Sequence, residues 1–173
     1  DDKAGDRLKQ IFIRLEMILG EVVKVEKLVS NEWELKTNKH RVIDIVDHSV
    51  DMLLLKDTSR IEVLADGEIS AVEVDFELYA TGVKNLIDNA LKYSSDKVLV
   101  SIDKNKICII SAGNELEPER LEFDRAFNRR VEISNSGLGL GLYIANQIFK
   151  KHGHALKYKH ENGKNIFMIC FGE

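Results

Sequence analysis

Residues 83–93 read Val-Lys-Asn-Leu-Ile-Asp-Asn-Ala-Leu-Lys-Tyr, and this stretch decides the fold once its surroundings are read with it. Asn85, Asn89 and Lys92 recur at i, i+4 and i+7, so they form one polar stripe on a predicted helix. Asparagine is a poor helix former. Amide oxygens ligate hard cations such as Mg²⁺, and a lysine neutralises phosphate. The stripe therefore indicates either a metal–phosphate site or a solvated face that tolerates two asparagines.

A second stretch, residues 134–148, places three alternating glycines directly before an apolar helical pattern. Free backbone N–H groups and the helix dipole make such a start attractive to phosphate. It is not a P-loop, because Leu142 follows Gly141, and it lacks the spacing of the dinucleotide-binding fingerprint. The motifs His-Arg-Asp and Asp-Phe-Gly of Ser/Thr/Tyr kinases are missing. Alone, the glycines also fit a packed turn, but the long polar loop before them favours a phosphate site.

Hydrophobic periodicity predicts an α+β domain behind a long N-terminal helix. Helices are expected over residues 42–54, 76–93 and from the glycines to 152, with Asp75 as an N-cap and Gly153 as a C-terminal stop. Strands are expected over 61–64, 71–74, 98–102, 107–109, 156–159 and 166–171, paired as hairpins, and residues 31–39 read as a connection. This order predicts a two-layer α/β sandwich with a mixed, mostly antiparallel sheet covered by helices on one face.

The N-terminal helix carries a heptad pattern of apolar residues. One position holds Leu8, Leu15, Val22 and Val29, and the position three residues later holds Ile11, Ile18 and Val25. Such a seam is typical of a coiled coil or a four-helix bundle. Packing of this helix on its own globular domain is the alternative, but it accounts less well for the regular seven-residue period.

Composition excludes several classes of protein. The chain has 173 residues, 44% hydrophobic and 31% charged, which is typical of a soluble globular protein. Its net charge of −4 argues against a nucleic-acid partner. Cys108 and Cys170 lie in apolar strand-like runs without metal-ligand spacing, so we expect reduced core cysteines. No apolar run approaches the length of a membrane span, and no signal peptide is evident.

These motifs resemble the catalytic, ATP-binding domain of bacterial sensor histidine kinases, which belongs to the superfamily of gyrase, Hsp90, MutL and histidine kinases. Residues 85–93 resemble the N box, residues 137–142 the second glycine box, and the loop of about 112–136 lies where the ATP lid belongs. The resemblance implies that Asn89 ligates Mg²⁺, that Asn85 and Lys92 contact the phosphates of ATP, and that Tyr93 packs near adenine. It also implies a phosphate cradle of backbone N–H groups from Gly137, Leu138, Gly139, Leu140, Gly141 and Leu142.

One position that separates branches of the superfamily and two departures from the family pattern refine the resemblance. Asn85 stands where the gyrase and Hsp90 branches carry a general-base Glu, which favours a kinase over a water-activating ATPase. Ser111 and Gly113 occupy the first glycine box, with Ser111 in place of the adenine-binding Asp and Glu115 in place of its second glycine. In the lid, the aromatic box has altered spacing, and Arg129 and Arg130 reach either a phosphate or only solvent. A degenerate, non-catalytic regulatory or dimerisation module is therefore the alternative function.

The resemblance also assigns the domains and partners. Residues 1–36 resemble the second helix of a dimeric bundle with its linker, and residues 37–173 the catalytic domain. None of the five histidines has the acidic neighbour and following proline of a phosphoacceptor, so we expect the acceptor helix to be absent. The implied partners are a second copy, which binds through the N-terminal helix, and the receiver domain of a response regulator. This part is expected to be the cytoplasmic portion of a sensor anchored in the bacterial inner membrane.

Overall fold

The protein is described as a computed structural model covering residues 2–30, 34–67, 70–124 and 140–171. It divides into two compact units, Asp1–Glu34 and Leu35–Glu173, which are described separately. No helix within these ranges is both long enough and apolar enough to cross a membrane.

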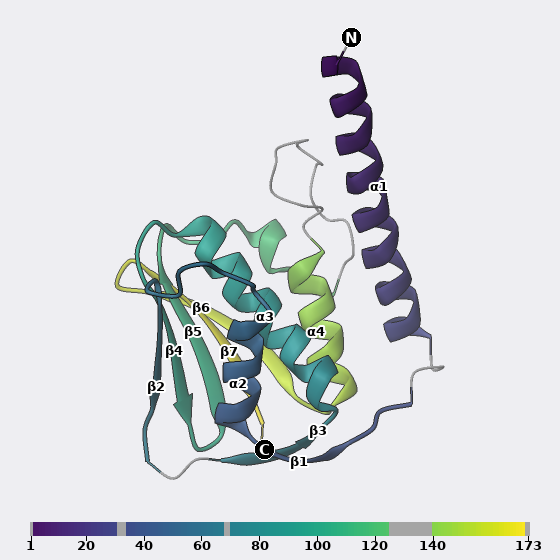
Figure 1. The fold of residues 1–173 in the computed structure, drawn as a ribbon. Helices are drawn as coiled ribbons and strands as arrows, with labels where there is room; N and C mark the ends of the chain where they lie inside the picture. Colours follow the sequence, from purple (N-terminus) through teal and green to yellow (C-terminus); the bar gives the residue numbers. More distant parts are fainter. Residues whose placement is uncertain (1, 31–33, 68–69, 125–139, 172–173) are drawn as a thin grey trace. The chain divides into compact units, whose positions relative to one another are not determined.

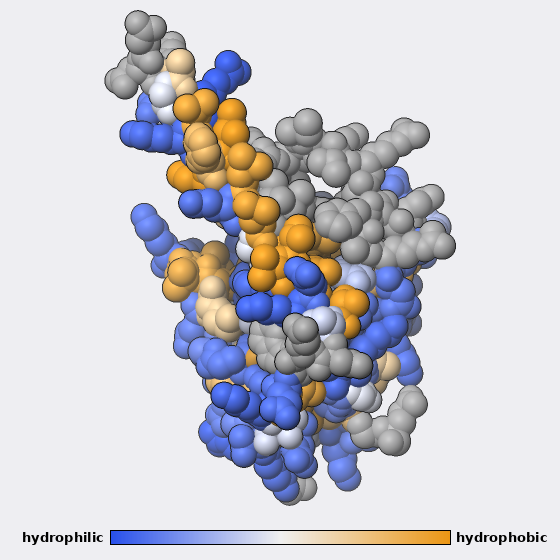
Figure 2. Space-filling view, turned by 90° about the vertical axis from the view of Figure 1, so that its right-hand side faces the viewer, coloured by the Kyte–Doolittle hydropathy of each residue, from blue (hydrophilic) through white to orange (hydrophobic). Residues whose placement is uncertain are grey.

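The first unit is a single helix, α1 (Asp2–Val29). Most of its described apolar side chains are exposed, with 58% of Leu8, 61% of Phe12 and 62% of Leu19 open to solvent. Figure 2 shows them as a continuous orange stripe along the helix. An exposed apolar stripe of this length is unusual for a helix with no partner, because burial of each such side chain stabilises by about 1.5–3 kcal/mol.

The second unit is built on a five-stranded sheet with the order β2-β4-β5-β7-β6. The strands are β2 (Ile61–Ala65), β4 (Val98–Asp103), β5 (Lys106–Ala112), β7 (Lys164–Cys170) and β6 (Ala155–Glu161). The β2–β4 pair is parallel and the other three pairs are antiparallel. The predicted mixed, mostly antiparallel sheet is therefore confirmed.

Three helices cover one face of this sheet (Figure 1). They are α2 (Val42–Asp51), α3 (Phe76–Tyr93) and α4 (Gly141–Lys151). The Asp75 carboxylate accepts a hydrogen bond from the Leu78 N–H at 3.2 Å, which confirms the predicted N-cap of α3. Gly153 has φ +74°, a conformation that glycine adopts without strain, and it ends α4 as predicted. The two-layer α+β architecture is thus confirmed.

The pairing of residues 61–64 with residues 71–74 in a hairpin is wrong. β3 (Ala71–Val74) pairs instead with β1 (Asn38–Arg41), which lies partly in the predicted connection, to form a separate two-stranded sheet. The backbone N–H of Asp66 donates to the carbonyl of Ile102 at 3.0 Å, so the chain leaves β2 alongside β4. The turn signal at 66–67 marked a real turn, but the strands that it separates belong to different sheets.

Two histidines at the end of α4 sit against α3. The backbone N–H of Asp75 donates to Nε2 of His152 at 3.1 Å. The other ring nitrogen of His152, Nδ1, lies 2.8 Å from the carbonyl oxygen of Ile148. The Tyr79 hydroxyl lies 2.7 Å from Nδ1 of His154. Burial lowers the pKa of both histidines and raises that of the Tyr79 hydroxyl. Both imidazoles are therefore held in the neutral form.

This cluster predicts a loss of stability in weak acid. The unfolded histidines take up protons near their ordinary pKa of about 6.5, whereas the folded ones resist protonation. The stabilisation is therefore complete above that pH and falls as the pH drops through the lowered folded values. In urea denaturation, we expect the midpoint to fall between pH 7.5 and pH 5.5, and to fall less for the double variant His152→Gln/His154→Gln. An equal fall in both proteins would contradict this account.

Candidate nucleotide-binding site

Close packing of α3 on α4 places the asparagine stripe beside the glycine-rich helix start. A Cβ built on Gly82 would lie 2.9 Å and 3.0 Å from two ring carbons of Phe149, so only glycine allows this approach. One turn further along α3, Nδ2 of Asn85 lies 3.5 Å from the carbonyl oxygen of Gly141, at the limit of a hydrogen bond. The structure thus places Asn85, the first residue of the N box, next to Gly141, the first residue of α4.

The N-terminus of α4 has no side-chain cap among the described residues. Leu140 is the N-cap residue and its carbonyl accepts the Ile144 N–H at 2.8 Å, but its own side chain is apolar and only 1% exposed. No acidic residue occupies the first turn. Within the described ranges no side chain caps the first N–H groups of the helix, and together with its positive dipole end these groups favour an anion.

The rest of the stripe lies along α3. Asn89 is half-buried and one turn beyond Asn85, and Lys92 is exposed with its amine 2.7 Å from the Asp88 carboxylate. Mg²⁺ in nucleotide sites commonly takes one or two protein oxygens and fills its remaining positions with phosphate oxygens and water. The half-buried amide of Asn89, one turn beyond the residue that lies next to Gly141, fits that requirement. In this structure the Lys92 amine pairs with the Asp88 carboxylate.

The end of β5 lies against the C-terminal end of α3. Ser111 is 6% exposed and opposite Asn165 in the β5–β7 register. Gly113 has φ +157°, and a Cβ there would lie 3.0 Å from Nδ2 of Asn165 and 3.9 Å from the carbonyl oxygen of Tyr93. The structure therefore brings Gly113 close to Tyr93, with Ser111 two residues earlier on β5, and the resemblance assigned all three to the adenine end.

Arg60 fixes that end of α3 and was not predicted from the sequence. Its Nη2 donates to the carbonyl of Ser94 at 2.5 Å and lies 3.2 Å from that of Asp96 and 3.4 Å from that of Leu91. A cation at these last carbonyls complements the helix dipole. The position of Arg60 before a strand gave no signal of this role, because the contact spans more than 30 residues.

Part of the predicted site lies outside the described residues. These residues are Gly137, Leu138 and Gly139 of the glycine run and Arg129 and Arg130 of the lid. Of the predicted lid, residues 112–124 are described and include a short 3-10 helix, Pro118–Leu121. Leu140, Gly141 and Leu142 are described, and the buried side chains of Leu140 and Leu142 leave only their backbone for a ligand.

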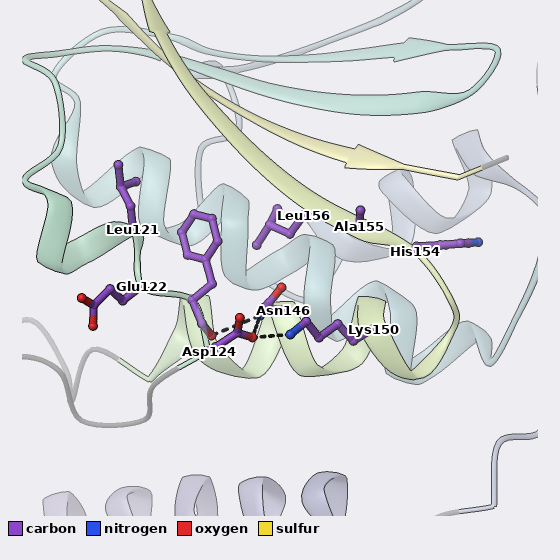
Figure 3. A pocket seen from close by; sticks show the side chains of 9 residues that line it. Leu121, Glu122, Asp124, Asn146, Lys150, His154, Ala155 and Leu156 are labelled. Atoms are coloured by element: carbon purple, nitrogen blue, oxygen red, sulfur yellow. Dashed lines mark hydrogen bonds and ion pairs between the residues drawn. The ribbon is translucent and has the colours of Figure 1, made fainter. Parts of the chain in front are cut away.

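A pocket of about 390 Å³ lies elsewhere on α4 (Figure 3). It is lined by Leu121, Glu122, Phe123, Asp124, Asn146, Lys150, His154, Ala155 and Leu156. Asn146, only 3% exposed, donates to the Phe123 carbonyl at 3.1 Å and to the Asp124 carboxylate at 3.0 Å, and Lys150 pairs with the same carboxylate. The hydrogen bond from Lys150 lowers the pKa of Asp124. None of the residues predicted to bind nucleotide lines this pocket.

Comparison with known proteins decides the family. The sequence pattern of the family described as histidine kinase-, DNA gyrase B- and HSP90-like ATPase matches residues 74–171, from the end of β3 to the end of β7. The chain belongs to this family. The match includes the asparagine stripe of α3 and the start of α4, and the family implies ATP binding.

Within this ATPase family, the chain is similar to sensor histidine kinases. It is 29% identical to the sensor histidine kinase ArsS of Helicobacter pylori over 168 residues, which are 94% of this chain and 39% of ArsS. The chain thus spans about two-fifths of the length of that relative. The similarity to ArsS includes both the N-terminal helix and the ATPase domain, because the matched residues make up 94% of this chain.

Solved histidine kinase structures share the fold. The histidine kinase AdeS of Acinetobacter baumannii matches 99% of this chain and 85% of its own, with a TM-score of 0.75 and 18% identity. Full-length ShkA, solved in complex with AMPPNP, matches 99% of this chain and 39% of its own, with a TM-score of 0.72 and 17% identity. At these identities the likeness concerns the fold.

Proposed function

We propose that this chain binds Mg·ATP and transfers the γ-phosphate to a histidine on a helix outside this sequence. The observation that carries the proposal is the uncapped N-terminus of α4 beside the asparagine stripe of α3. Backbone N–H groups and a half-buried amide supply the two kinds of contact that a metal-bound polyphosphate needs. The similarity to ShkA, which was solved with an ATP analogue, supports the same conclusion.

Each residue then has a defined task. The N–H groups at the start of α4 bind phosphate oxygens, and Asn89 holds Mg²⁺ together with those phosphates. Phosphoryl transfer depends mainly on such positioning and charge neutralisation. Asn85 cannot take a proton, so it does not activate water. This suits transfer to an imidazole, which is already a nucleophile, better than it suits hydrolysis.

Calorimetric titration of the chain with ADP and ATP, with and without Mg²⁺, tests the proposal. We expect saturable binding of both nucleotides and tighter binding when Mg²⁺ is present. No binding at millimolar nucleotide would overturn the proposal and favour the non-catalytic module, which Ser111 and Glu115 support. Steady release of inorganic phosphate from ATP by the isolated chain would instead indicate a hydrolytic ATPase.

The whole protein would act as a dimeric sensor. The exposed apolar stripe of α1 supports pairing with the α1 helix of a second copy in a four-helix bundle, with residues 1–36 as the bundle helix and linker and residues 37–173 as the catalytic domain. The acceptor histidine of the full protein would pass the phosphate to the receiver domain of a response regulator. By the resemblance, the domain lies on the cytoplasmic side of a protein anchored in the inner membrane.

A further inference from the structure

A hydrogen-bonded cluster in the last hairpin holds the loop that follows Ser111. The Tyr158 hydroxyl donates to Oδ1 of Asn165 at 2.7 Å and accepts the backbone N–H of Leu116 at 3.0 Å. Nδ2 of Asn165 donates to the carbonyl of Asn114 at 3.0 Å. Nε2 of His160 donates to the carbonyl of Gly113 at 3.1 Å. Three side chains of β6 and β7 thus hold three of the four residues between 113 and 116.

The cluster is connected and partly buried, so its hydrogen bonds depend on one another. Asn165 is 6% exposed, and its donor and its acceptor are both satisfied within the cluster. The N–H of Gly113 also donates to the carbonyl of Gly163 in the hairpin turn, at 3.0 Å. Loss of one partner leaves a polar group of the cluster without its hydrogen bond, which costs more than the mean value of a single bond.

We propose that Tyr158, Asn165 and His160 are positioning residues for the adenine end of the nucleotide site. The inference rests on the proposed function, which places adenine near Tyr93 and Ser111. The loop from Gly113 to Leu116 starts two residues after Ser111, and Gly113 lies near the carbonyl of Tyr93. The hairpin cluster therefore fixes the chain that borders the base.

The cluster also compensates for a departure from the family pattern. Glu115 stands where the first glycine box has its second glycine, so the loop lacks one residue of free backbone conformation. Its neighbours Asn114 and Leu116 are both held by the cluster. The shape of the loop is thus set by side chains of the last hairpin and not by a second glycine.

The test compares the affinity for ADP, which carries adenine, with the affinity for tripolyphosphate, which has no nucleobase. Tyr158→Phe removes both hydrogen bonds of the hydroxyl and keeps the ring, and Tyr79→Phe is the matched control because it removes a buried hydroxyl contact at His154, away from the loop. In calorimetric titrations with Mg²⁺, we expect Tyr158→Phe to bind ADP about tenfold more weakly. Binding of tripolyphosphate, which has no base, should stay within about twofold of wild type. Tyr79→Phe should bind both ligands as wild type does.

A conservative exchange at His160 gives an independent check if Tyr158→Phe folds poorly. His160→Ala should weaken ADP binding, and His160→Gln, which retains an N–H donor, should restore most of it. Unchanged ADP binding in both Tyr158→Phe and His160→Ala, or an equal loss for ADP and tripolyphosphate, would overturn the inference. Failure of the wild-type chain to bind ADP would instead overturn the proposed function itself.

Discussion

Asn89→Ala is expected to abolish the gain in nucleotide affinity that Mg²⁺ provides. Asn89 is the only residue assigned to the metal, and alanine has no oxygen to replace its amide. Loss of a protein ligand leaves the metal bound by phosphates and water alone, with its position no longer fixed. In the full-length kinase, we expect autophosphorylation to fall by at least about 100-fold, the scale of losing one group that stabilises a transition state.

The binding measurement separates this role from a general loss of structure. ADP is titrated into wild type and Asn89→Ala with Mg²⁺ and with EDTA. The variant should bind equally under both conditions, at the metal-free affinity of the wild type. Asn105→Ala, in the exposed turn between β4 and β5, is the matched control and should keep the Mg²⁺ effect. An Mg²⁺ effect of wild-type size in Asn89→Ala would refute the assignment.

Gly82→Val is expected to lower the free energy of unfolding by about 3 kcal/mol, because overpacking of a filled core has costs of this size. Even the first added carbon would lie 2.9 Å from a ring carbon of Phe149, which is fully buried and packed against Tyr79 with ring centroids 5.1 Å apart. Because the ring is fully buried, it can move away only if its neighbours shift as well. The gain in helix propensity on replacing glycine, under about 1 kcal/mol, is too small to offset the clash.

Urea denaturation of the whole chain measures this effect. Thr81→Val is the matched control, since it places the same side chain one residue earlier on α3 at a half-exposed position. We expect the control to differ from wild type by less than about 0.5 kcal/mol, as is usual for surface substitutions. If Gly82→Val proves as stable as the control, α3 and α4 do not pack as closely as the structure shows.

The sequence predicted the architecture well because its signals were local. The cap at Asp75, the stop at Gly153 and the alternation in β4 and β5 each depend on residues a few positions apart, and all are present in the structure. The pairing of β3 with β1 was missed because it depends on which strand lies nearby in space. The turn at 66–67 and the short polar strand 38–41 carry no information on that point.

In the candidate site too, the residues with local sequence signals were predicted and those that depend on long-range contacts were not. The asparagine stripe and the glycine run were visible as spacings, whereas Arg60, Tyr158 and Asn165 act through contacts between residues far apart in the chain. The sequence did contain one signal for Asn165, because it alternates with Phe167 and Ile169 on the buried side of β7. A polar residue in the buried phase of a strand requires a partner. Sequence alone does not say which partner that is.

The N-terminus of α4, which has no side-chain cap among the described residues, links the stability of the helix to the proposed binding of nucleotide. Leu140 has helical backbone angles, φ −81° and ψ −14°, and a buried side chain, so this position favours core packing over a capping serine or aspartate. An aspartate there would also place a negative charge next to the proposed phosphate site. Among the described residues no side chain caps this end of the helix, so under the proposed function bound ATP would act as its cap and as a removable structural part of the domain.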